Sequence, residues 1–160
     1  MGVSQTPETS IAERVGRLMP GITAALVRLA RIPSIAFGGF PEAPLLAAAD
    51  LVAELLRDAG VDEVSMLRLP GAPPVVTGTI PAPKGAPTVL LYAHYDVQPP
   101  GDEALWATPP FEPTERDGAI YGRGVADDKS NVLMHVGALR AFDGRPPVGI
   151  KVVIEGQEEV

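Results

Sequence analysis

The sequence predicts an α/β fold, a three-layer sandwich around a mixed and partly parallel sheet. Two amphipathic helical stripes precede a group of short apolar runs, and a third stripe separates the last two of these runs. The 18 prolines and 17 glycines concentrate between these segments, where loops are expected. With 160 residues, 46% hydrophobic and 21% charged, the chain can bury the core of one globular domain.

The first part of the chain is predicted to form two helices. Apolar residues recur at steps of three and four over residues 11–29, and Pro20 followed by Gly21 is expected to kink or split that helix. A second stripe covers residues 45–56. Gly60 stands where a glycine commonly ends a helix.

The rest of the chain is predicted to alternate strands with one helix. Residues 61–69, 75–80, 88–96 and 148–156 have the apolar content and flanking turn residues of strands. The run at 88–96 contains the continuous apolar stretch TVLLYA, which is typical of a central strand buried on both faces. The helical stripe at 129–142 lies between the last two strands, and this alternation of helices with apolar strands indicates a partly parallel, mixed sheet.

Composition excludes several classes of function. The net charge of −7 argues against a basic surface for nucleic acid, and no run of 18 uncharged apolar residues could cross a membrane. The chain has no cysteine, so a metal site must use His94, His135, carboxylates and water, a donor set typical of catalytic zinc. The N-terminus lacks the pattern of a secretory signal, and we therefore expect a cytoplasmic protein.

A histidine and an aspartate end the third apolar run. Residues two apart in a strand point to the same side, so Asp96 can accept a hydrogen bond from one ring nitrogen of His94 and leave the other for a metal. The alternative is a strand-end histidine that local hydrogen bonds satisfy. For this pair taken alone, both interpretations stay open.

Two further clusters follow. In YGRGVADDK, residues 121–129, either Asp127 or Asp128 can cap the following helix, but a cap needs one carboxylate and does not explain the two glycines. Glu158 and Glu159 follow the last apolar run and form either a solvated acidic turn or a pair that shares a cation.

The three clusters are expected to meet, because functional groups of open α/β sheets gather beyond the carboxyl ends of the strands. A histidine with several carboxylates can hold one or two divalent cations and still supply a base. These residue types predict metal-assisted hydrolysis of an amide bond.

At these residues the chain resembles the zinc metallopeptidase family of carnosinase-like dipeptidases, succinyl-diaminopimelate desuccinylase and glutamate carboxypeptidase. The resemblance rests on AHYDVQPP, YGRGVADDK and EGQEE in this order, and HYDVQP and DDK are closest to the dipeptidase branch. It implies a dinuclear zinc peptidase catalytic domain that cleaves dipeptides or small acyl-amino acids by a metal-bound hydroxide. Two divalent metal ions are implied, with cobalt or manganese as alternatives to zinc.

The resemblance also implies a role for each matching residue. His94 resembles a ligand of one metal, Asp127 the carboxylate that bridges both, and Glu159 a ligand of the second. Glu158 resembles the general base, and Asp96 resembles the residue that positions His94.

The resemblance further implies groups that these residues do not contain: another carboxylate ligand, a late histidine, and a smaller inserted domain for dimerisation. His135 lies in a predicted helix and is expected to be a half-buried helix residue instead of that histidine. We therefore expect residues 1–160 to be the N-terminal portion of a catalytic domain, inactive by itself, from a protein whose full-length form is a homodimer. The alternative is a non-catalytic truncated paralogue that serves as a binding or assembly module.

Overall fold

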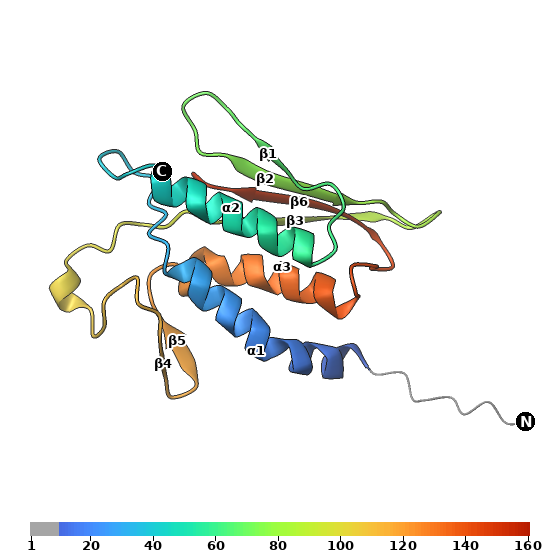
Figure 1. Cartoon of the computed structure of the whole chain (residues 1–160), viewed down its shortest axis with the longest axis horizontal. Helices are drawn as coiled ribbons and strands as arrows, with labels where there is room; N and C mark the ends of the chain where they lie inside the picture. The colour runs from blue at the N-terminus through green and yellow to red at the C-terminus, as the bar shows by residue number, and fades with distance from the viewer. Residues whose placement is uncertain (1–9) are drawn as a thin grey trace, which may run out of the picture.

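The computed structural model describes residues 10–160 as a four-stranded sheet with three helices on one side of it (Figure 1). The helices are α1 (Ile11–Ala30), α2 (Ala43–Asp58) and α3 (Ser130–Ala141). The strands of the sheet are β1 (Ser65–Leu67), β2 (Val75–Ile80), β3 (Thr88–His94) and β6 (Gly149–Glu155). The α/β class is confirmed, and the described residues supply the sheet and the helices on one of its faces.

The sheet is mixed, in the order β1-β2-β6-β3. Strand β6 pairs antiparallel with β2 and parallel with β3, which confirms the partly parallel sheet. The prediction that the run at 88–96 forms a central strand is wrong for the described residues. β6 occupies the centre, and β3 lies at the edge with Leu90 61% exposed and Tyr92 47% exposed.

One hydrophobic core lies between the sheet and the helices. Alternate residues of β6 point into it, and Ile150, Val152 and Ile154 are all buried. Helices α2 and α3 pack on the sheet, while α1 packs mainly against α3. The predicted apolar face of α3 is confirmed by the burial of Val132, Val136 and Leu139 in this core.

Two predictions about the first helices have different outcomes. Pro20 lies inside one continuous helix, so the helix is not split there, and the alternative, a kink at Pro20, stays a prediction. Ser10 accepts a hydrogen bond from the Glu13 N–H, and Glu13 bonds back to the Ser10 N–H, which fixes the start of α1 by a capping box. Gly60 has φ +86°, which confirms it as the residue that ends α2.

The long segment between β3 and α3 runs outward beyond the end of β3 (Figure 1). It contains the short 3₁₀ helix η1 (Glu103–Leu105), the hairpin of β4 (Thr114–Arg116) and β5 (Ala119–Tyr121), and the turn η2 (Val125–Lys129). This segment brings residues 125–129 back to the end of β3, where His94 lies.

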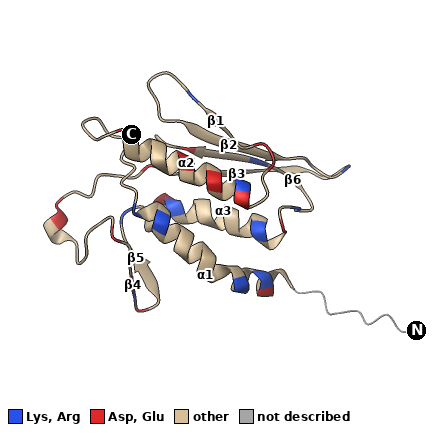
Figure 2. Ribbon diagram, in the orientation of Figure 1, with Lys and Arg blue, Asp and Glu red and all other residues tan. Residues whose placement is uncertain are grey.

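Charged residues are distributed over the whole molecule (Figure 2). Lysines and arginines occur in all three helices and are not gathered on one of them. Among the described residues, no helix is both long and apolar enough to cross a membrane.

Candidate metal centre

His94 is the last residue of β3 and is 5% exposed. Because β3 and β6 are parallel, their carboxyl ends lie at the same edge of the sheet, and His94 is in register with Glu155. Beyond His94 the two segments stay paired, because the Tyr95 N–H donates to the Glu155 carbonyl at 2.8 Å. This pairing carries residues 94–96 and 156–159 to one place, as the sequence predicted.

Asp96 connects these two chain segments. Its side chain is fully buried, and one oxygen lies 3.3 Å from Nδ1 of His94. Its two oxygens accept the backbone N–H groups of Glu158 and Glu159, each at 3.1 Å. Asp96 therefore contacts the ring of His94, and its role in positioning that ring stays a prediction. It also fixes the backbone of both glutamates, which the sequence did not reveal.

The turn η2 supplies the next two carboxylates, joined by a cis peptide bond. The side chain of Asp127 is 77% exposed, whereas Asp128 is buried and accepts the backbone N–H of His94 at 3.0 Å. Neither aspartate makes a side-chain cap to a helix, so the helix-cap interpretation is wrong. Asp128 instead ties the start of α3 to the end of β3, and Asn131 donates to its other oxygen.

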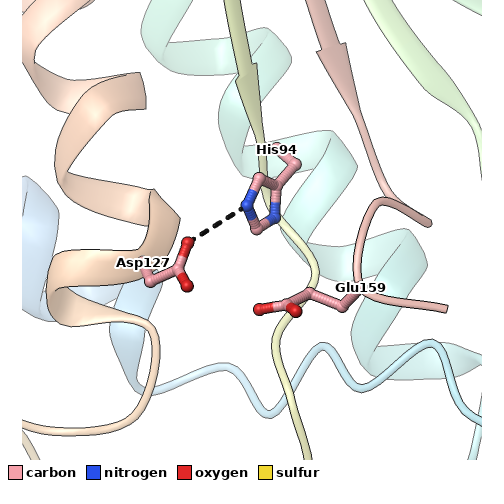
Figure 3. Close-up of side chains that lie close together, drawn as sticks. All are labelled: His94, Asp127 and Glu159. Atoms are coloured by element: carbon pink, nitrogen blue, oxygen red, sulfur yellow. Dashed lines mark ion pairs between the residues drawn. The ribbon is translucent and has the colours of Figure 1, made fainter.

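His94, Asp127 and Glu159 converge (Figure 3). Each offers a possible ligand atom, and these atoms lie within 4.8 Å of one another. Nε2 of His94 is 3.3 Å from the Asp127 carboxylate, and a Glu158 oxygen lies 3.7 Å from the same nitrogen. The ring thus presents Nδ1 to Asp96 and Nε2 to the open side of the cluster.

The negative charges around His94 change its protonation. Burial of the ring opposes the charged form, but the hydrogen bond with Asp96 and the charges of Asp96, Asp128 and Glu158 outweigh it, and they raise the pKa of His94 to about 9. A cation at Nε2 would replace the proton as the partner of these carboxylates. Imidazole nitrogen and carboxylate oxygen are both zinc ligands, so the donor set fits a divalent cation.

Three polar side chains of this region were not found from the sequence. Gln98 donates to the Glu159 carboxylate at 2.7 Å and to its carbonyl at 3.2 Å. The Tyr92 hydroxyl donates to Glu155. Lys129 is fully buried, and burial lowers its pKa to about 7 against the opposing charge of Asp96. Gln98 and Lys129 both lie inside the quoted motifs, and that is the signal that could have identified them.

His135 is half-buried on α3, as predicted, and its Nε2 bonds to the Tyr92 carbonyl at 2.9 Å. It is not in the group of His94, Asp127 and Glu159.

Comparison with known proteins identifies the segment that carries this cluster. A family model described as Peptidase family M20/M25/M40 matches residues 90–160. Residues 90–160 are M20 peptidase sequence. The M20 segment includes His94, Asp127 and Glu159, so all three members of the cluster fall inside the match.

Individual M20 relatives extend the likeness beyond that segment. The chain is 54% identical over 77 residues to a cysteinylglycine-S-conjugate dipeptidase of Corynebacterium striatum, covering 47% of this chain and 17% of that protein. It is 37% identical over 121 residues to a Beta-Ala-His dipeptidase of Mus musculus, covering 68% and 25%. The crystal structure of human carnosine dipeptidase 1 superposes with a TM-score of 0.85 at 29% identity, covering 97% of this chain and 36% of that one.

These relatives confirm the resemblance to the dipeptidases and the fold of the M20 catalytic domain. The chain spans between 17% and 36% of the length of these three proteins.

Proposed function

We propose that the chain carries part of the metal centre of a hydrolase that cleaves peptide or amide bonds of dipeptides or small acyl-amino acids. The observation that carries the proposal is the convergence of His94, Asp127 and Glu159, whose ligand atoms lie within 4.8 Å of one another. The two relatives whose names describe dipeptidases support the substrate class.

Each residue of the cluster has a role in this proposal. His94 (through Nε2), Asp127 and Glu159 would hold a divalent cation, Zn²⁺ first and Co²⁺ or Mn²⁺ as alternatives. Bound there, the cation would act as a Lewis acid toward the carbonyl oxygen of the substrate. Asp96 holds the ring with Nδ1 turned inward, which keeps Nε2 available to the cation.

Glu158 is proposed as the general base. Its side chain is 46% exposed, and its oxygen lies 3.7 Å from Nε2 of His94, so water can reach it beside the cluster. It would accept the proton of the attacking water and deliver that proton to the leaving amine. The bond from its backbone N–H to Asp96 fixes where this side chain starts.

We also infer that residues 1–160 alone do not turn over substrate. Within residues 10–160, one group of three or more possible metal ligands lies close together, which is sufficient for one cation. The family resemblance implies two, with Asp127 shared between them. The second cation would need ligands outside this group, and residues 1–160 would then form the N-terminal portion of a catalytic domain. The homodimer and the cytoplasmic location stay predictions from the sequence.

Metal titration tests the proposal. The purified protein is titrated with Zn²⁺ and with Co²⁺ alongside the variants His94→Ala and Asp127→Ala. Partners outside the ligand shell change metal affinity by about 10- to 100-fold, so loss of a ligand is expected to weaken binding by about 100-fold or more. Equal binding by the wild type and His94→Ala would contradict the proposed centre.

A second candidate function is a non-catalytic metal-binding or assembly module. Over the described part of the chain, residues 10–160, a single group of three candidate ligands is found, and it favours the module because one cation can be bound without dinuclear chemistry. An assay of Cys-Gly and β-Ala-His hydrolysis separates the two functions. It uses the full-length protein expressed from the gene, with the Glu158→Gln variant as control. Turnover that depends on Glu158 supports the hydrolase, and metal binding without turnover supports the module.

A further inference from the structure

Lys129 is the last residue of η2, two residues after Asp127, and its side chain is completely buried. A buried lysine is costly unless its Nζ finds hydrogen-bond partners. Among residues 10–160 its Nζ donates to two backbone carbonyls, that of Ile32 at 2.7 Å and that of Leu29 at 3.1 Å. A residue of the M20 segment is thereby attached to a part of the chain that lies outside the family match.

The Leu29 carbonyl lies in the last turn of α1, and the Ile32 carbonyl lies two residues beyond the end of the helix at Ala30. The last carbonyls of a helix have no partner within the helix, and the negative end of the helix dipole favours a donor or cation there. Both carbonyls also accept a backbone N–H, that of Leu29 from Ile32 and that of Ile32 from Ser34. Lys129 adds a charged donor from another element, 100 residues along the chain from Leu29. The bond fixes the position of η2 relative to the end of α1.

The same end of α1 also holds the segment that follows His94. Ser34 is fully buried, and its hydroxyl donates to the Tyr95 carbonyl at 2.6 Å. Its own carbonyl accepts the Val97 N–H at 3.0 Å. Residues 29–34, which we name the α1 brace, therefore contact two of the three segments that carry the proposed ligands, those of His94 and Asp127.

Gly124 shows how closely the lysine is enclosed. It has φ +75°, and a Cβ added to it would lie 3.4 Å from Cδ of Lys129 and 2.5 Å from Cγ1 of Val97. The Lys129 N–H in turn donates to the Gly124 carbonyl at 3.1 Å. The second glycine of YGRG thus packs directly on Val97 and beside the Lys129 side chain, and a larger residue there would collide with Val97.

We propose that Lys129 is a positioning residue of the metal centre, which through its two bonds to the α1 brace holds Asp127 at the distance from His94 that a cation requires. The inference rests on the proposed metal centre and adds a residue that fixes the position of one proposed ligand relative to another. Lys129 acts through Asp127 and touches neither cation nor substrate.

The test replaces Lys129 by methionine, which keeps the length and apolar stem but removes the donor. Far-UV circular dichroism and thermal unfolding first establish the temperature range in which the variant is folded. Co²⁺ titration in that range is expected to show about tenfold weaker binding, the scale found for partners outside a metal's ligand shell, with an altered visible Co²⁺ spectrum. A purely structural role would lower the unfolding temperature and leave the affinity and spectrum of the folded protein unchanged, and that result would overturn the proposal.

Lys151→Met is the matched control, because Lys151 is exposed on β6. It is expected to bind Co²⁺ as the wild type does, and weaker binding in this control as well would overturn a specific role for Lys129. If Lys129→Met does not fold, Ser34→Ala tests the other contact of the brace. Weaker Co²⁺ binding by folded Ser34→Ala supports the brace, and wild-type binding overturns it.

The titration also separates this inference from the proposed function. Wild-type binding that is lost in His94→Ala but kept in Lys129→Met overturns the role of Lys129 alone. Equal titration of the wild type and His94→Ala overturns the metal centre, and with it the role of Lys129.

Discussion

The two sides of the candidate metal centre differ in burial. His94 and Asp96 are 5% and 0% exposed, whereas the side chains of Asp127 and Glu158 are 77% and 46% exposed. The buried side is held by hydrogen bonds between distant segments, and the exposed side is fixed mainly through its backbone. Substitutions on the buried side are therefore expected to lower both the free energy of unfolding and the metal affinity. Substitutions on the exposed side are expected to lower the metal affinity alone.

The largest effect is expected for Asp96→Ala. The change leaves the N–H groups of Glu158 and Glu159 without their acceptor and removes the carboxylate beside Nδ1 of His94. The ring keeps the backbone carbonyl of residue 96 as a partner. Breaking a buried, charge-assisted network of this kind lowers the free energy of unfolding by about 3 kcal/mol. Urea unfolding of the metal-free wild type and of the variant measures this difference in unfolding free energy.

Asp127→Ala is the control from the exposed side. Its unfolding free energy is expected to stay within about 0.5 kcal/mol of wild type, while metal binding is lost. Equal destabilisation by both variants would contradict the division into two sides.

The protonation of His94 gives the second prediction. Its folded-state pKa is raised from 6.5 to about 9, so the protonated ring stabilises the metal-free protein fully below pH 6.5, and this contribution is lost as the pH rises through 9. Unfolding of the wild type and of His94→Ala between pH 6 and 10 should show their difference shrinking over this window. Since a cation must displace this proton, metal affinity should rise over the same window by about tenfold per pH unit.

The Asp96→Asn variant checks the cause. NMR titration of the His94 ring in metal-free protein should give a pKa near 9 in the wild type and a lower value in the variant. An unchanged pKa would mean that Asp96 is not the dominant partner of His94.

Gly156→Ala tests the packing around Tyr95, the residue between the buried His94 and Asp96. A Cβ at Gly156 would lie 2.2 Å from the ring of Tyr95, which is fully buried and donates to the Pro74 carbonyl at 2.6 Å. Because neither the ring nor the strand can move freely, the overpacking should lower the unfolding free energy by about 2 kcal/mol in a thermal or urea unfolding experiment.

Gly16→Ala serves as the matched substitution, since nothing lies within 4 Å of the added Cβ on exposed α1. It should stabilise the protein by about 0.5 kcal/mol through helix propensity. Loss of stability at both glycines would show that the Tyr95 contact is not the cause.

The smallest effect is expected for Gln98→Ala. Its amide donates to the Glu159 carboxylate at 2.7 Å, so its removal frees a ligand on the partly exposed side without opening the core. Metal affinity should fall by about tenfold in a Co²⁺ titration, with the unfolding free energy within about 0.5 kcal/mol of wild type. Unchanged affinity would show that Gln98 does not orient Glu159.

The elements of the fold could largely be predicted from local patterns. The run at 75–80 is a strand with the predicted bounds, and the stripe at 45–56 lies within α2. The run at 61–69 contains only the three-residue strand β1, because apolar content does not specify which backbone groups find a partner. The position of β3 at the edge was missed for a related reason: composition records how apolar a strand is, and its neighbours decide whether it is covered.

The candidate site divides in the same way. The sequence by itself determined which side-chain types are available: two histidines, no cysteine, and carboxylates beside His94 and after the last strand. A metal site in this chain therefore has to use imidazole and carboxylate ligands instead of thiolates. Only the tertiary structure decided that Asp96 binds the backbone of Glu158 and Glu159, that Asp128 holds His94 instead of capping a helix, and that Lys129 reaches α1. These contacts join residues between 34 and about 100 positions apart, and local propensity carries no information on such pairings because chain folding alone brings them together.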